Sequence, residues 1–191
     1  MDAQVGSYSQ LRDRYEDALE LLDEVLAMFS RGPAEQAMSR LVSGLWVVKQ
    51  SLDTGDWRSF RSDWMHHPLA QIVHQDPLTS WAYRKPWGYP GDARLLDFIY
   101  GGPGIDTDLS NASALGREIY GFTSNLVASR AIRERRNSVT DLVDRVAHER
   151  GRPISVLAIG AGHLREAERS RALAAGEVAR WVALDQDREI L

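Results

Sequence analysis

The chain lacks cysteine and has almost no lysine. Without cysteine, its 191 residues can form no disulfide, thiolate nucleophile or cysteine-ligated metal site. Lysine occurs only at Lys49 and Lys85, and the formal net charge of −4 gives no overall basic field for nucleic acid. No apolar run approaches the roughly 20 residues that span a bilayer, and the polar N-terminus has no signal-peptide core. These absences predict a cytoplasmic protein with no membrane span and no nucleic-acid partner.

Helices are predicted over most of the first 150 residues. Apolar residues recur at steps of three and four over residues 7–31 and again from Pro33 to about residue 52, which predicts two amphipathic helices packed as a hairpin. Pro77, behind the capping residue Asp76, predicts another helix start. From about residue 110 to 150 the pattern predicts two more helices.

One segment between the helices cannot be regular structure. Lys85–Asp92 holds two prolines and two glycines in eight residues, which predicts an ordered loop. We expect Asp92, the last of these residues, to cap a helix over residues 93–100. The loop also presents two aromatic side chains, Trp87 and Tyr89.

The end of the chain predicts a β-α-β unit. Ile154–Ile159 is an apolar run rich in β-branched residues, and it leads directly into Gly160-Ala161-Gly162. A second apolar run, Val178–Leu184, ends on the acid Asp185. A helix that begins at the glycine turn would present backbone N–H groups, and the acid could bind ribose hydroxyls. The pattern therefore indicates an adenosine-containing cofactor.

The details of the turn disfavour two common nucleotide motifs. The dinucleotide fingerprint requires a third glycine where this chain has Arg165, which disfavours a nicotinamide-dependent oxidoreductase. No Gly-Lys-Ser/Thr follows the turn, so the chain has no phosphate-binding P-loop either. S-adenosylmethionine has no pyrophosphate and tolerates a looser turn.

These motifs resemble those of the class I S-adenosylmethionine-dependent methyltransferases. Val156–Gly162 looks like the first motif of that family, and Val182–Asp187 looks like the second. The resemblance implies that Gly160, Ala161 and Gly162 bind the methionine end of S-adenosylmethionine, that Asp185 holds its ribose, and that Gln186 lies near its adenine. In the first motif, Ala158 stands where an acid is usual and Leu164 where a third glycine is usual.

A second resemblance covers the loop. Residues 85–100, together with the arginine-rich residues 130–136, resemble a bacterial methyltransferase subgroup that has a helical N-terminal region and includes proteins linked to 3-hydroxy fatty acid methyl ester signals. This resemblance implies that the loop closes over the methyl donor, with Tyr89 and Asp92 facing the cofactor or the acceptor. The alternative is that Asp92 is only a helix cap and that Tyr89 only packs.

The acceptor implied is a small molecule, for example a fatty acid whose carboxylate pairs with an arginine of residues 130–136. The alternative for these arginines is a solvated helix face, with Glu134 among them. The sequence shows no convincing nucleophile–base pair, so catalytic residues stay unassigned. His66, His67 and His74 match no metal-ligand spacing, and His163 is expected to be a packing or solvent-facing residue.

The sequence thus predicts an α/β protein. Residues 1–150 form a helical N-terminal or cap region, and residues 151–191 begin a Rossmann-like domain that binds S-adenosylmethionine and is incomplete. The expected activity is methyl transfer to a small molecule. The alternative is a non-catalytic helical interaction module with a vestigial nucleotide-binding fold.

An incomplete sheet leads to a testable prediction about ligand binding and self-association. Two strands bury little apolar surface and leave an edge unpaired, so the chain alone is expected to bind S-adenosylmethionine weakly or not at all, or to self-associate through that edge. Calorimetric titration combined with light scattering measures both properties. Submillimolar binding by a monodisperse monomer would contradict this expectation.

Overall fold

The protein is mostly helical and has one small parallel sheet. The computed structural model describes residues 2–187, and the side chains of residues 14–187. The described chain forms two compact units. The first comprises the residues up to Ser80 together with Thr107–Thr123, and the second comprises Trp81–Asp106 together with the residues from Ser124 onward.

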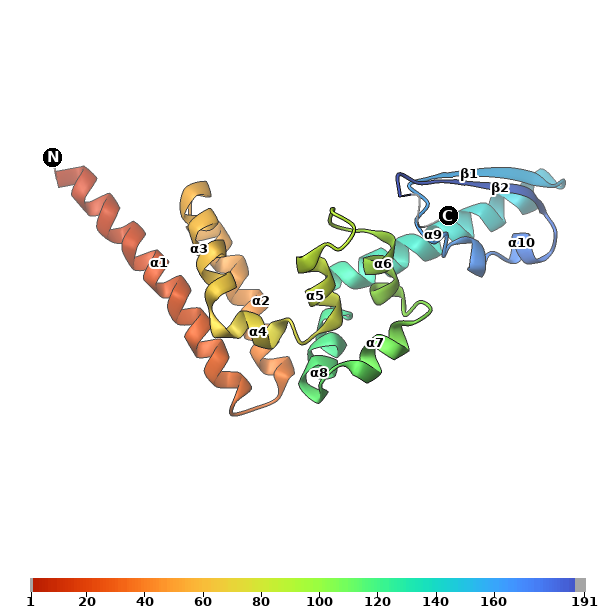
Figure 1. Cartoon of the computed structure of the whole chain (residues 1–191). Coiled ribbons are helices and arrows are strands. Elements are labelled where there is room, and N and C mark those ends of the chain that lie inside the picture. Colours follow the sequence, from red (N-terminus) through yellow and green to blue (C-terminus); the bar gives the residue numbers. More distant parts are fainter. Residues whose placement is uncertain (1, 188–191) are drawn as a thin grey trace. The chain divides into compact units, whose positions relative to one another are not determined.

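The helices and strands follow one another along the chain as drawn in Figure 1. The helices before the sheet are α1 (Asp2–Phe29), α2 (Ala34–Ser51), α3 (Thr54–His66), α4 (Pro68–Val73), α5 (Pro77–Arg84), α6 (Ala93–Tyr100), α7 (Ile105–Asn111), α8 (Ala114–Thr123) and α9 (Val127–Arg150). The sheet segment contains β1 (Ile154–Ile159), the short 3-10 helix η1 (Ala167–Arg169), α10 (Arg171–Ala174) and β2 (Val178–Leu184).

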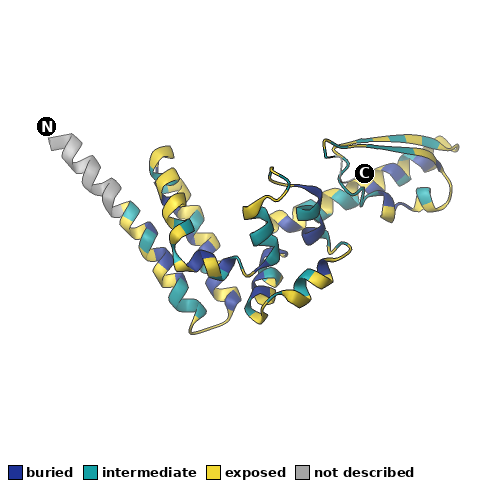
Figure 2. Ribbon diagram, in the orientation of Figure 1, coloured by how far each residue is buried: buried dark blue, intermediate teal, exposed yellow. Residues whose placement is uncertain are grey.

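The first unit is built on the predicted helical hairpin. Helices α1 and α2 pack against each other, and Leu22 and Val25 of α1 belong to a buried cluster that also contains side chains of α2, α3, α4 and α8. Figure 2 marks the buried residues of these helices in dark blue. Gly44 lets the two helices approach closely, because a Cβ there would come within 2.6 Å of a Leu21 methyl carbon. The core therefore joins helices that are distant in sequence, as Ile119 of α8 packs into it.

A buried carboxylate links α5 to α8 within this unit. Asp76 is fully buried and accepts hydrogen bonds from the backbone N–H groups of Leu78 and Thr79 and from the hydroxyl groups of Thr79 and Thr123. Burial raises the pKa of Asp76, and the bonds from Thr79 and Thr123 oppose that rise. Asp76 is thus the cap that the sequence predicted, and it also anchors α8.

The second unit contains the parallel sheet. Strand β1 pairs with β2 in a parallel arrangement, with Val156 opposite Trp181 and Ile159 opposite Leu184. Helices α9 and α10 cover one face of the strands, where Val143 and Ala172 pack against the strand residues that point inward (Figure 1). The β-α-β connection thus has the parallel direction that the sequence predicted.

The opposite face of the two strands is left open by the described residues. Leu157, Ile159 and Leu184 are 58%, 79% and 50% exposed, and burial along β1 alternates from residue to residue. Parallel sheets are usually covered on both faces. We refer to Leu157, Ile159 and Leu184 as the open sheet face.

The observed elements agree closely with the expected ones, with two differences. Both strands and the helix over residues 93–100 have their expected bounds, whereas the connection between the strands contains only η1 and α10 rather than a full helix. From the sequence we placed a boundary after residue 150, just before the first strand. In the structure, α9 belongs to the same compact unit as the strands, and it packs against β1.

Among the residues that the structure describes, no helix is both long enough and apolar enough to cross a bilayer.

Replacing the buried cap is expected to destabilise the first unit. Asp76→Ala would remove the acceptor of the Leu78 and Thr79 amides and one hydrogen bond of the Thr123 hydroxyl, at a cost of about 2–3 kcal/mol in the free energy of unfolding. Asp53→Ala is the matched control, because Asp53 caps α3 through two backbone amides but is exposed. Urea unfolding followed by circular dichroism measures both. An equal loss in the two variants would contradict the anchoring role.

Candidate functional site

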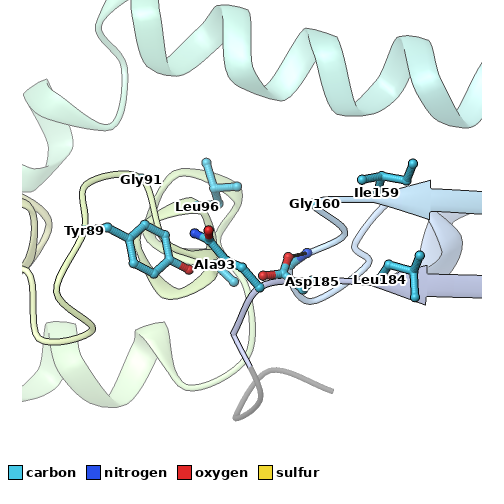
Figure 3. A pocket seen from close by; sticks show the side chains of 10 residues that line it. Tyr89, Gly91, Ala93, Leu96, Ile159, Gly160, Leu184 and Asp185 are labelled. Atoms are coloured by element: carbon cyan, nitrogen blue, oxygen red, sulfur yellow. Dashed lines mark hydrogen bonds between the residues drawn. The ribbon is translucent and has the colours of Figure 1, made fainter.

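The candidate site lies in the second unit, at the carboxyl ends of β1 and β2. A cavity of about 400 Å³ opens there, and Figure 3 shows Tyr89 on one side of it and Ile159, Leu184 and Asp185 on the other. Its walls come from the strand ends, the glycine turn, α6 and the loop Lys85–Asp92, which we call the proline–glycine loop. The lining residues are Tyr89, Gly91, Ala93, Leu96, Ile159, Gly160, Gly162, Leu184, Asp185 and Gln186.

The glycine turn has the geometry that requires glycine. Gly160 and Gly162 have φ values of 67° and 53°, in the left-handed region that L side chains rarely adopt. A Cβ on Gly162 would also lie 3.3 Å from the Cβ of Ala93, the first residue of α6. The turn can therefore pass close to α6 only because glycine occupies this position.

Asp185 folds back onto the turn. Its Oδ2 accepts a 2.7 Å hydrogen bond from the backbone N–H of Gly162, and its Oδ1 accepts a 3.0 Å bond from the N–H of Asp187. The bond from Gly162, followed by that from Asp187, lowers the pKa of Asp185 below its ordinary value of 3.8. Each carboxylate oxygen has two lone pairs, so Asp185 retains acceptor capacity toward a ligand hydroxyl.

The structure brings most of the candidate cofactor-binding residues together. Tyr89, Gly160, Gly162, Asp185 and Gln186 all line the same cavity, although Tyr89 precedes the others by more than seventy positions. Their convergence follows from the parallel strands, whose carboxyl ends meet at one edge, and from the loop that precedes α6.

Two candidate residues do not line the cavity. The N–H of Ala161 donates to the Leu184 carbonyl at 3.1 Å and so joins the turn to β2. Asp92 is buried, accepts a 2.8 Å hydrogen bond from the Leu95 N–H, and accepts bonds from the Trp81 indole N–H. Asp92 therefore has the capping role that the sequence offered as its alternative.

The expected helix does not begin at the glycine turn, so the prediction that the N-terminus of a helix presents its backbone N–H groups there is wrong. Leu164 has a φ of 51°, which interrupts helical geometry two residues after Gly162. The first regular structure after the turn is η1, and α10 starts only at Arg171. The backbone N–H groups available at the cavity are those of the turn itself.

An ion-pair cluster that the sequence analysis missed holds the segment after the turn. Asp97 of α6 is 2% exposed at its side chain, and its Oδ1 and Oδ2 accept bonds of 2.8 and 2.9 Å from Nε and Nη2 of Arg165. The Nδ1 of His163 lies 2.8 Å from Oδ2 of the same carboxylate. Asp97 raises the pKa of Arg165, which also pairs with Glu168. His163 thus contacts a buried acid, in addition to the packing role that the sequence predicted for it.

One sequence signal could have indicated this cluster. Asp97 interrupts an apolar helix, and an acid on such a face is rarely buried without a partner. The identity of the partners was not predictable, since they lie 66 and 68 positions away.

The proline–glycine loop is fixed by aromatic contacts. The Trp87 ring meets the His163 ring edge-on, with centroids 6.3 Å apart, and meets the Trp81 ring in the same manner at 6.0 Å. Trp81 is itself held by Asp92. The loop that carries Tyr89 is therefore braced against both α5 and the segment after the glycine turn.

The arginines of α9 divide into two groups. Arg130 and Arg135 are exposed, as the solvated-face alternative expects. Arg133 instead donates to the carbonyl oxygens of Ile99 and Ser124, and the Arg136 guanidinium lies 4.6 Å from the Tyr100 ring centroid. Burial, followed by the charge of Arg169, lowers the pKa of Arg136. None of these arginines lines the cavity.

Among the described residues, no group of three or more His, Asp or Glu side chains is placed to hold a metal ion. His67 caps α4 by accepting from the Leu69 N–H, and His66 contacts the Ser62 carbonyl.

Comparisons with known proteins give no assignment. The chain matches no protein-family model, no curated protein and no solved structure.

The contact between Asp185 and the turn is expected to depend on pH. Because the pKa of Asp185 is lowered in the folded protein, its stabilising contribution is fully present above about pH 4 and is lost as the pH falls through the lowered value. The amide resonance of Gly162, followed by NMR during acid titration, should report a midpoint below 3.8. Asp185→Asn should remove this titration, and a midpoint above 3.8 would contradict the hydrogen bond.

Proposed function

We propose that the cavity binds S-adenosylmethionine and that the chain has methyltransferase function with a Rossmann-like binding unit. The class I resemblance of the glycine turn and of the segment ending in Asp185 motivates the proposal. The observation that carries it is the 2.7 Å hydrogen bond between Asp185 and the Gly162 N–H, because it unites the acid and the turn beside one cavity.

The lining residues fit the parts of such a ligand. A cavity of about 400 Å³ falls within the range of small-molecule sites. Asp185 offers acceptors for ribose hydroxyls, and the turn at Gly160 and Gly162 leaves room for the methionine end. Ile159, Leu184 and Leu96 supply apolar walls, and Gln186 supplies an amide that would lie near the adenine.

The turn supports this ligand over a dinucleotide. A pyrophosphate is normally bound at the start of the helix that follows the glycine turn. Here Leu164 breaks that geometry, and Arg165 faces Asp97. The turn therefore lacks the helix N-terminus that a pyrophosphate needs.

The proposed chemistry asks little of the protein beyond alignment. Bound S-adenosylmethionine supplies a methyl group already activated by the positive sulfonium. The residues around the cavity orient the acceptor for in-line attack and exclude water, with Tyr89 and the braced loop closing one side. If the acceptor is a carboxylate, such as that of a fatty acid, no general base is required.

A second candidate function rests on the first unit. Trp46 and Val47 of α2 are 69% and 64% exposed, which suits a helical interaction module in which the cavity is vestigial. This alternative predicts no ligand at the strand ends.

Binding of the demethylated product distinguishes the two functions. S-adenosylhomocysteine, titrated to millimolar concentration, is expected to shift the amide resonances of Gly160, Gly162 and Gln186 in NMR spectra, and Asp185→Ala is expected to weaken binding at least about tenfold. Asp187→Ala is the matched control, because Asp187 donates to Asp185 through its backbone N–H, which alanine retains.

Competition identifies the ligand class. NAD at the same concentration should not displace S-adenosylhomocysteine, because the turn offers no pyrophosphate site. Because the unpaired sheet edge leads us to expect weak binding, shifts that appear only near millimolar ligand support the proposal. Absence of shifts at the three cavity residues, with the protein folded, would overturn it in favour of the interaction module.

A further inference from the structure

The segment after the glycine turn contains an unfavourable backbone conformation. Leu164 has a φ of 51°, in a region that costs energy for any residue with a Cβ. Its N–H donates to the Ala161 carbonyl at 3.0 Å, which closes the turn. Such a conformation persists only when its surroundings fix it.

The two residues that flank Leu164 are both fixed by one carboxylate. Asp97 accepts two hydrogen bonds from Arg165 and lies within 2.8 Å of the His163 ring. The two-point contact with a guanidinium sets orientation as well as distance. The backbone between His163 and Arg165 is therefore tied at both ends to the same point on α6.

Asp97 itself has little freedom to move. Its side chain is 2% exposed, and a Cβ on Gly102 would come within 2.7 Å of its carboxylate. Its carbonyl oxygen accepts the Gly102 N–H at 2.9 Å. The carboxylate is thus a rigid reference point for the turn.

The same helix forms a wall of the cavity. Ala93 lies one turn before Asp97, approaches Gly162 closely, and lines the cavity together with Leu96. The position of the glycine turn relative to this wall therefore depends on the contacts that Asp97 makes.

We propose that Asp97 is a positioning residue for the cavity: by binding both neighbours of Leu164, it holds the glycine turn in the conformation that keeps the cavity preformed for its ligand. The effect on ligand affinity rests on the proposed function, whereas the effect on the turn does not. If only a fraction of the molecules has the turn in this conformation, the apparent affinity for the ligand falls in proportion to that fraction. Holding the turn in one conformation therefore raises the apparent affinity.

The first experiment needs no ligand. Hydrogen exchange by NMR is measured at the Leu164 and Gly162 amides in the wild type, Asp97→Asn and Asp144→Asn. Asp144 is the matched control, because it is a nearly buried aspartate of the same unit that binds Ser170 and Arg171 away from the turn. Asp97→Asn is expected to accelerate exchange at Leu164 about tenfold, and Asp144→Asn to leave it unchanged.

A rescue variant separates positioning from simple destabilisation. Glycine adopts a positive φ without penalty, so in the Leu164→Gly background the turn should no longer need Asp97. Adding Leu164→Gly to Asp97→Asn should therefore bring the Gly162 exchange rate back to within about threefold of the wild type. If Asp97→Asn does not fold, Arg165→Lys gives the same test, because lysine keeps the charge but loses the two-point contact.

The second experiment measures affinity for S-adenosylhomocysteine by NMR titration. Asp97→Asn should weaken binding about tenfold, and addition of Leu164→Gly should recover most of that loss. Wild-type exchange at Leu164 in Asp97→Asn, or no recovery in the double variant, would overturn the positioning role. If the wild type fails to bind at all, the proposed function fails, and the exchange rates still decide the role of Asp97.

Discussion

The buried pair between Asp97 and Arg165 is the constraint on which the second unit depends. A carboxylate at 2% exposure is tolerated only when its charge is paired and its lone pairs are used, and Arg165 and His163 together do both. These two partners flank Leu164, where the segment after β1 departs from a helical path. With the positioning role proposed for Asp97, the shape of the turn depends on an acid of α6 as well as on its own glycines.

Other aspartates of the chain accept hydrogen bonds from backbone N–H groups. Asp76 and Asp92 cap α5 and α6, while Asp144 receives the amides of Arg171 and Ala172 at the start of α10. In each case a short acidic side chain satisfies N–H groups that a helix start leaves free. Asp185 does the same for the glycine turn, which has no helix to follow it. A ligand at the cavity would thus meet a carboxylate already oriented by the protein.

Local patterns in the sequence were enough to predict most elements, because periodicity and capping are local properties. The strands, the helix over residues 93–100 and the cap at Asp76 followed directly from them. The meeting of Asp185 with Gly162 was also predictable, since the carboxyl ends of adjacent parallel strands share an edge.

Features that depend on distant contacts were not predictable. The break at Leu164 lies between two residues that contact Asp97, and Asp97 precedes Arg165 by 68 positions. The sequence left two roles open for Asp92, because an acid before a helix can either cap that helix or face a ligand. The structure shows that Asp92 caps α6 and also accepts from the indole N–H of Trp81, a residue that no local pattern links to it. Arg133 likewise gains its role from carbonyl groups of other segments rather than from its own helix.

Two residues of the open sheet face also belong to the cavity. Ile159 and Leu184 are largely exposed on the strands and at the same time form an apolar wall beside Asp185. Any surface that covered this face would therefore also touch the cavity wall, so covering the strands and filling the cavity are thermodynamically linked. The linkage is reciprocal. A surface bound to the sheet would change the affinity of the cavity for a small molecule by some factor, and the small molecule would change the affinity of the sheet for that surface by the same factor.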